Sequence, residues 1–213
     1  MNTVLTPTTL PRAATNKRYL ALFDFDGTLT SRDSMFLFLQ HAVGLPRLLL
    51  GLAVLSPMLV ANRLGLVANQ RAKESLLAWF FNGWQTSRFA EVANHFSANQ
   101  LDRYVREDAR QRLIDHQDAG HEVIVVSASA QDWLRSWCEQ QGLQLIATRL
   151  SSQEGVLSGK LQGANCTGAE KVARLNQSLQ TSDYQAIFAY GDSRGDEEML
   201  ALADFPNFRV FKD

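Results

Sequence analysis

The sequence predicts an α/β protein with a parallel Rossmann-like sheet, helices on both faces of that sheet, and an inserted all-helical cap. After residue 120, short apolar strand candidates alternate with helix candidates, which is typical of a parallel sheet covered on both sides. Between the first strand candidate and residue 120 the character is helical throughout. We therefore expect these parts: a loose tail over 1–17, a core formed by 18–32 and 111–213, and a cap over 33–110.

The elements can be justified in chain order. The tail is rich in Thr, Pro and Ala, and it lacks the unbroken apolar segment of a secretory signal. Strand candidates are short apolar runs that end in turn or small residues: Tyr19–Phe25, Glu122–Ser127, Leu143–Leu150, Gln185–Gly191 and a last one at Phe208–Phe211. The core helix candidates are Asp132–Gln141, Gly168–Leu179 and Asp196–Ala203. Glycines at 155, 159 and 163 suggest a small hairpin.

Composition excludes several classes of protein. The chain has 213 residues, 46% of them hydrophobic, and a formal net charge of −1, which argues against a strongly basic nucleic-acid binder and against wholesale disorder. The two cysteines, Cys138 and Cys166, form no CxxC pair, so neither a disulfide scaffold nor a zinc module is expected. A reducing, cytoplasmic setting fits this composition best.

Acidic side chains follow two of the predicted strands. Asp24 and Asp26 follow the first strand, and Asp192 and Asp196 follow the Gln185–Gly191 strand. Ligands of open α/β sheets bind beyond the carboxyl ends of the strands, so we expect these carboxylates to converge on one small volume. Clustered carboxylates repel each other and need a cation, and an all-oxygen ligand set points to Mg²⁺ rather than zinc.

The same constellation can process a phosphate ester. Of Asp24 and Asp26, one carboxylate can attack phosphorus while the other protonates the leaving oxygen and then activates water. Ser127 can donate a hydrogen bond to a phosphoryl oxygen, helped by the backbone N–H groups that follow it. Lys171, in the first turn of its helix, can neutralise the charge shared by the aspartyl group and the phosphate.

Each of these residues also has a purely structural interpretation. An Asp-x-Asp-Gly sequence by itself is usually a turn. Ser127 can cap the helix that follows it, and Asp196 can cap its own helix. Lys171 can be an ordinary solvated helix lysine, and Lys160 in the hairpin is a rival for the phosphate-binding role.

Four motifs together resemble a known family. DFDGTLT at Asp24–Thr30, VIVVSAS ending at Ser129, Lys171, and GDSRGDEEML at Gly191–Leu200 are similar to the motifs of the haloacid dehalogenase superfamily. The helical insert directly after the first motif and NCTGAEKVARL at Asn165–Leu175 resemble the phosphoserine-phosphatase-like branch. The resemblance spans nearly all of residues 19–211.

The resemblance implies a role for each motif residue. Asp24 would be the nucleophile that forms an aspartyl-phosphate, and Asp26 the general acid and base. Mg²⁺ would be held by the Asp24 side chain, the Asp26 carbonyl and Asp192, with Asp196 supporting these ligands. The implied phosphate contacts are Ser127, Ala128, Lys171, Gly27 and Thr28. Dehalogenases of the family lack the second aspartate, so Asp26 favours phosphate ester hydrolysis over carbon–halogen cleavage.

The cap departs from that of true phosphoserine phosphatases. Gly27 replaces a serine of the first motif, and Asp33 stands where a glutamate binds the substrate amine. The cap region that would supply an arginine for the substrate carboxylate, near Glu74–Phe81, has none, although Arg71 lies close by. Phosphoserine is therefore a weak candidate. We expect a small phosphorylated metabolite, with Asp33 and Arg71 as candidate specificity residues.

The cap is strongly apolar and leaves a second substrate class open. Leu48–Ala61 is apolar apart from Ser56, and its fourteen residues fall short of the roughly 20 that span a bilayer. Cap helices that pack on each other explain this best. The alternative is a surface helix that dips into an anionic membrane between Arg47 and Arg63, in a stretch that has no acidic residue between Asp33 and Glu74.

Three functions therefore remain under consideration. The favoured one is a phosphatase of small metabolites. The alternative is a phospholipid-headgroup phosphatase, peripheral on the inner face of the membrane, since some phosphatidylglycerophosphatase members of this branch look similar in having an apolar cap. A non-catalytic phosphate-binding module is the third, and the intact acid/base pair weighs against it.

Overall fold

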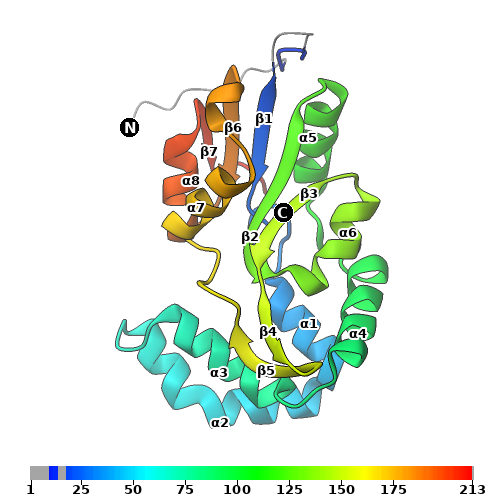
Figure 1. The fold of residues 1–213 in the computed structure, drawn as a ribbon, viewed down its shortest axis with the longest axis vertical. Coiled ribbons are helices and arrows are strands. Elements are labelled where there is room, and N and C mark those ends of the chain that lie inside the picture. Colours follow the sequence, from blue (N-terminus) through cyan, green and yellow to red (C-terminus); the bar gives the residue numbers. More distant parts are fainter. Residues whose placement is uncertain (1–9, 14–17, 213) are drawn as a thin grey trace.

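The central feature is a parallel sheet of five strands in the order β3-β2-β1-β6-β7 (Figure 1). A computed structural model describes residues 10–13 and 18–212. The strands of the sheet are β1 (Tyr19–Phe23), β2 (Glu122–Ala130), β3 (Gln144–Thr148), β6 (Ala186–Gly191) and β7 (Phe205–Phe208). Every pairing between them is parallel.

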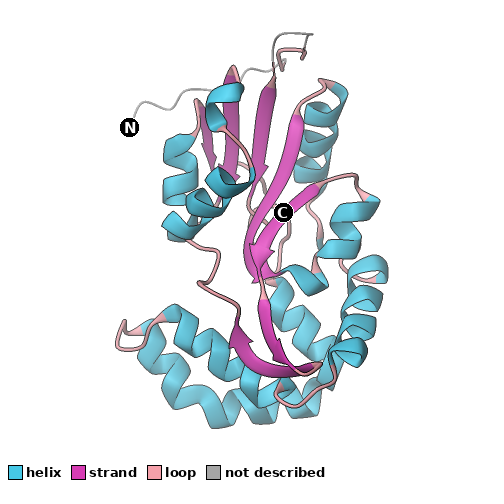
Figure 2. Ribbon diagram, in the orientation of Figure 1, coloured by secondary structure: helices cyan, strands magenta, loops and turns pink. Residues whose placement is uncertain are grey.

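Helices cover both faces of this sheet, which confirms the predicted fold class (Figure 2). Successive side chains of a strand point to opposite faces, and β1 shows this: Ala21 and Phe23 join one buried cluster, whereas Leu20 and Leu22 join another. The first cluster includes side chains of α5 (Glu107–Asp118) and α6 (Arg135–Gln140), and the second includes side chains of α7 (Ala169–Ser178) and α8 (Glu197–Leu202). Single 3₁₀ turns lie at Asp102–Tyr104, Gln131–Trp133, Thr181–Asp183 and Arg194–Asp196.

The segment inserted after β1 is helical and lies at the carboxyl ends of the strands (Figure 1). It contains α1 (Ser34–Val43), α2 (Leu45–Arg63), α3 (Asn69–Phe81) and α4 (Thr86–Asn99). The predicted hairpin is present as the antiparallel pair β4 (Leu150–Gln153) and β5 (Val156–Leu161). The hairpin packs on this segment, because the backbone N–H groups of Gly83 and Thr86 donate to the carbonyls of Leu157 and Gly155.

Two expectations about the ends of the chain need correction. The last strand is Phe205–Phe208 rather than Phe208–Phe211, because Arg209 adopts a left-handed backbone conformation with φ of 53° and ends the pairing with β6. The tail expected over 1–17 lies largely outside the described residues. Its described part, 10–13, is not loose, since Ala13 N donates to Ala119 O over 2.8 Å. The boundaries expected between core and cap remain a prediction.

The strand order creates a switch point between β1 and β6. From β1 the chain moves to one side for β2 and β3, and it then returns to the other side of β1 for β6. Ligands of doubly wound sheets bind at such a point, beyond the carboxyl ends of the strands. Asp24 and Asp192 directly follow the two strands that flank it, and the N–H of Asp24 donates to Tyr190 O over 2.9 Å.

Candidate active site

A buried ion-pair network occupies the switch point. Lys171 extends from the first turn of α7, and its Nζ donates to Asp24 Oδ1 over 2.6 Å, to Asp196 Oδ1 over 2.7 Å and to Val126 O over 2.7 Å. Lys171 and Asp196 are each 1% exposed, and Asp24 is 6% exposed. Lys171 is therefore not a solvated helix lysine.

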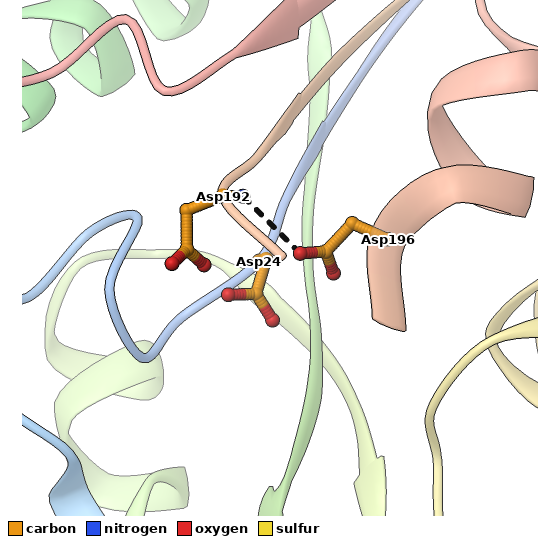
Figure 3. A group of neighbouring side chains, drawn as sticks. All are labelled: Asp24, Asp192 and Asp196. Atoms are coloured by element: carbon orange, nitrogen blue, oxygen red, sulfur yellow. Dashed lines mark hydrogen bonds between the residues drawn. The ribbon is translucent and has the colours of Figure 1, made fainter. Parts of the chain in front are cut away.

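Three carboxylates lie together at this point (Figure 3). Asp24, Asp192 and Asp196 each offer an oxygen, and these atoms lie within 4.8 Å of one another. Gly27 has φ of +87°, and a Cβ there would stand 2.5 Å from Asp192 Oδ2, so a glycine is needed for the turn to pass this close to the carboxylate. The ligand atoms that these three side chains offer are carboxylate oxygens, which fit a hard cation such as Mg²⁺.

The Asp196 carboxylate accepts hydrogen bonds both from Lys171 and from the backbone at the start of its own helical turn. Its Oδ2 accepts from Ser193 N over 3.0 Å and from Asp192 N over 3.2 Å, while its Oδ1 accepts from Lys171. Both oxygens therefore already have donors. The Asp192 carboxylate, together with that of Asp24, is better placed to hold a cation, with Asp196 supporting them.

Asp26 is held apart from this network by two strong donors. Ser34 N donates to Asp26 Oδ1 over 2.6 Å, and Ser129 Oγ donates to Asp26 Oδ2 over 2.6 Å. Ser34 begins α1 and Ser129 lies near the end of β2. The acidic side chain is thus fixed between the inserted segment and the sheet, with both oxygens accepting hydrogen bonds.

Burial changes the protonation of these groups. It raises the pKa of Asp24 to about 7 and the pKa of Asp26 to about 6. Burial also raises the pKa of Asp192, with a further contribution from the Asp196 carboxylate. Burial would raise the pKa of Asp196 as well, but Lys171 outweighs this and keeps that pKa below its usual value.

A cavity of about 490 Å³ opens beside Asp24 and Asp26. Of the predicted phosphate contacts, Ser127, Ala128 and Lys171 line it, whereas Gly27 and Thr28 lie against Asp192 and do not. Ser127 is 1% exposed, and its hydroxyl accepts from Ser129 N over 3.0 Å. This hydrogen bond lies within β2, which continues to Ala130, and not at the start of a helix. The helix-capping role considered for Ser127 is therefore wrong.

Of the two expected specificity candidates in the cap, Asp33 lines the cavity and Arg71 does not. Asp33 lines the cavity, and its Oδ1 also caps α1 by accepting from Met35 N over 2.9 Å. Arg71 does not line the cavity and is exposed. Two residues along a helix turn by about 200°, so Arg71 and Lys73 lie on nearly opposite faces of α3. Lys73 takes the position expected of Arg71.

Lys73 joins the cap to β2 and to the loop that precedes α7. Its Nζ donates to Ala128 O over 2.9 Å and to Asn165 Oδ1 over 2.8 Å. Burial lowers the pKa of Lys73. The rival lysine, Lys160, lies elsewhere: its side chain is 60% exposed, and its Nζ is 3.5 Å from Glu74 Oε2.

Sequence reasoning missed three residues of the site. Ser34 and Ser129 hold Asp26, and Lys73 enters the cavity. The position of Ser129 two residues after Ser127 was a usable signal, since both lie on one face of a strand. The sequence carries no comparable signal for Ser34 or Lys73.

Comparison with known proteins identifies the class. The profile of the haloacid dehalogenase-like hydrolases matches residues 21–201. The chain belongs to this family. This is the family that the motifs predicted, and the match to a family of hydrolases weighs against a non-catalytic module.

Individual relatives and structures are similar to the chain over most of its length. It is 34% identical to Protein CicA of Caulobacter vibrioides over 200 residues, which cover 91% of this chain and 86% of CicA. It is 26% identical to the histidinol-phosphatase of Neisseria meningitidis over 130 residues, 58% of this chain and 59% of that protein.

Two solved structures support the fold. A protein of unknown function from Bordetella pertussis has a TM-score of 0.76 and 23% identity, covering 88% of this chain and 87% of that one. A phospho-aspartyl intermediate analogue of phosphoserine phosphatase has a TM-score of 0.57 and 21% identity, covering 88% and 84%. At these identities the likeness concerns the fold alone.

Proposed function

We propose that this protein hydrolyses phosphomonoesters of small metabolites with Mg²⁺, through an aspartyl-phosphate formed on Asp24. The observation that carries the proposal is the pairing of a buried Asp24 with Lys171 beside a cavity that Asp26 also lines. Lys171 bonds to Oδ1, so the other oxygen of Asp24 is available as the nucleophile.

The two aspartates divide the chemistry between them. Asp24 Oδ2 attacks phosphorus, an O–P bond forms, and the bond from phosphorus to the leaving oxygen breaks. Asp26, whose pKa burial raises to about 6, gives its proton to that oxygen. Asp26 then takes a proton from water as the water attacks phosphorus, and the Asp24–phosphoryl bond breaks to release inorganic phosphate.

Ser127 and the N–H of Ala128 would bind the phosphoryl oxygens, and the Lys171 ammonium would offset their negative charge. Ser127 and Ala128 line the cavity directly after the stretch of β2 that pairs with β1. Lys171 bonds to Val126 O, which brings its charge next to Ser127. Donors fixed before the reaction lower the cost of the charge that develops on phosphorus.

The carboxylate group fits Mg²⁺ by its chemistry and spacing. Asp24, Asp192 and the carbonyl of Asp26 would hold the ion, and Asp196 would orient its neighbours. When bound, the ion would screen the negative charges of the nucleophile and the phosphate from each other. It would also favour the ionised form of Asp24, opposing the effect of burial.

Release of p-nitrophenol from p-nitrophenyl phosphate tests the proposal. We expect turnover that requires Mg²⁺, stops with EDTA and resumes when Mg²⁺ is restored. Asp24→Asn should lower kcat by at least about a thousandfold, because an amide cannot replace the nucleophile. Full turnover in EDTA, or by Asp24→Asn, would contradict the proposal.

A phospholipid headgroup is the second candidate substrate. The specific observation in its favour is that α2, whose outer surface is apolar and exposed, contributes Leu59 and Asn62 to the cavity. A substrate held in a membrane beside α2 would therefore be close to the cavity. Comparing kcat/KM for glycerol phosphate esters with and without acyl chains, presented in mixed micelles, separates the two candidates.

A further inference from the structure

The surface of α2 is apolar, and the residues that the structure describes leave most of it uncovered. Only Leu48 and Gly51 of its nineteen residues are buried. Leu49, Leu50, Val54 and Val60 are 50–60% exposed, and the turn that follows adds Leu64 and Leu66 at 68% and 77%. A helix that is apolar all round is normally buried in a protein core or in lipid. The described residues cover only one side of α2, where Leu48 is buried and Leu52, Leu55 and Leu59 pack against the core.

The helix has an inner face and an outer face. Gly51 lies on the inner face, where a Cβ would stand 2.3 Å from the ring of Phe80, so α2 packs closely on α3. At about 100° per residue, Leu49, Leu50 and Leu64 lie on the outer face, and Arg47 and Arg63 lie on its two opposite flanks. Apolar side chains between flanking arginines are the pattern of a helix that lies in a membrane interface.

The positive charge on and around α2 favours binding to an anionic surface. No Asp or Glu occurs between Asp33 and Glu74, whereas Arg47, Arg63 and Arg71 are all exposed there. Trp79 of α3, which lies beside Gly51, is 42% exposed. Indole rings of this kind favour the boundary between headgroups and acyl chains.

The position of α2 permits such contact. It lies at the end of the molecule farthest from the sheet (Figure 1). Among the described residues, α2 is the one helix long and apolar enough to cross a membrane. Its mean hydropathy is 1.6, and 11% of its apolar 18-residue stretch is buried. The helix is nineteen residues long, five more than the fourteen-residue apolar stretch Leu48–Ala61 identified in the sequence. Its packing on α3 favours a position along the surface over a span.

We propose that α2 and the Leu64–Leu66 turn dock on an anionic lipid bilayer, with the outer face in the interface and Arg47 and Arg63 at the phosphate groups. Docking would hold α2, whose inner residues Leu59 and Asn62 line the cavity, at the lipid surface. The proposal does not depend on the proposed function, because vesicle binding requires no phosphate release.

Co-sedimentation of the full chain with vesicles tests the docking. We expect binding to vesicles enriched in phosphatidylglycerol and much less to phosphatidylcholine alone. Leu50→Glu with Leu64→Glu should lower the apparent partition coefficient at least about tenfold, since it places charge in the apolar contact. Arg47→Gln with Arg63→Gln should lower it about tenfold as well, and this variant should lose the salt dependence.

Matched controls separate docking from unfolding and from self-association. Ile114→Glu places a charge on an exposed apolar site of α5 and should bind vesicles as the parent does. Leu50 and Leu64 do not line the cavity, so turnover of p-nitrophenyl phosphate should persist in their variant and report an intact fold.

Three results would overturn the proposal. The first is no binding to anionic vesicles by a folded, active preparation. The second is a dimer in analytical ultracentrifugation that only Leu50→Glu with Leu64→Glu dissociates, which would assign the surface to a second copy. The third is resistance of bound protein to carbonate extraction, which would make α2 a span.

Discussion

The two aspartates that follow β1 differ in the donors that surround them. Asp24 faces the Lys171 ammonium, whereas Asp26 accepts from a backbone N–H and from the Ser129 hydroxyl. Donors to a carboxylate favour its ionised form and lower its pKa, while burial raises it. The pKa of Asp26, raised to about 6, is therefore already held down by Ser129.

Removal of this donor should be visible in the pH profile. Ser129→Ala should raise the pKa of Asp26, so the alkaline limb of kcat, where the acid loses its proton, should move up by about half to one pH unit. Ser136→Ala, which removes an exposed hydroxyl bonded to Asn94, is the matched control and should leave the profile unchanged. If the alkaline limb of the kcat profile moved to lower pH or did not move, Asp26 would not be the general acid.

At the scale of the element, the two basic side chains of α3, Arg71 and Lys73, lie on different faces of the helix. Lys73 reaches the end of β2, where it donates to Ala128 O, and Arg71 faces solvent. The apolar core of α3, with Leu76, Leu77 and Phe80 buried, fixes this rotation of the helix. Which cation enters the cavity therefore depends on packing rather than on charge.

This geometry predicts unequal effects of two similar substitutions. Lys73→Met should lower kcat/KM for any ester on the order of tenfold, because the cap loses its hydrogen bonds to Ala128 and Asn165 and the cavity loses a positive charge. Arg71→Met should change it by less than about twofold. Equal losses in steady-state assays of the two variants would contradict the assigned orientation of α3.

The α2 helix shows where sequence reasoning reaches its limit at this scale. Its apolar run predicts burial but does not say whether protein or lipid supplies the cover, and packing between cap helices was the favoured interpretation. Asp24 and Asp192 were predictable, because strand ends of a parallel sheet meet at one edge. Lys171 was predictable from its place in the first turn of a core helix. Ser34 and Lys73 were not, because their positions depend on how the inserted helices rest on the sheet.

At the scale of the whole molecule, a buried chain of hydrogen bonds joins the N-terminal residues to the sheet. His121 Nε2 must donate to Pro11 O, at 2.7 Å, so its Nδ1 accepts from His116 Nδ1 over 2.8 Å. His116 Nε2, 2.9 Å from the Tyr190 hydroxyl, then accepts from it. Burial lowers the pKa of both imidazoles, that of His116 to about 3, so both are neutral at pH 7, as this pattern of donors and acceptors requires.

Stability should depend on pH through this chain. Between pH 6.5 and 3, His116 binds a proton in the unfolded protein but not in the folded protein. The contribution of His116 to the free energy of unfolding therefore falls as the pH falls. His116→Gln should destabilise the protein at pH 7, but its cost should shrink by about 2 kcal/mol between pH 7 and pH 5. Urea unfolding of both proteins at each pH checks this, and a cost that grows toward pH 5 would contradict the neutral assignment.

The central claim is that a phosphoryl group passes through Asp24, and the most direct measurement is to find it there. Asp26→Asn should slow the release of phosphate more than its capture, since no base then activates the water. After brief incubation with Mg²⁺ and p-nitrophenyl phosphate and an acid quench, mass spectrometry should detect one added phosphoryl group on the peptide that contains Asp24. A phosphoryl group on another residue, or active turnover with none captured under any quench, would contradict the account.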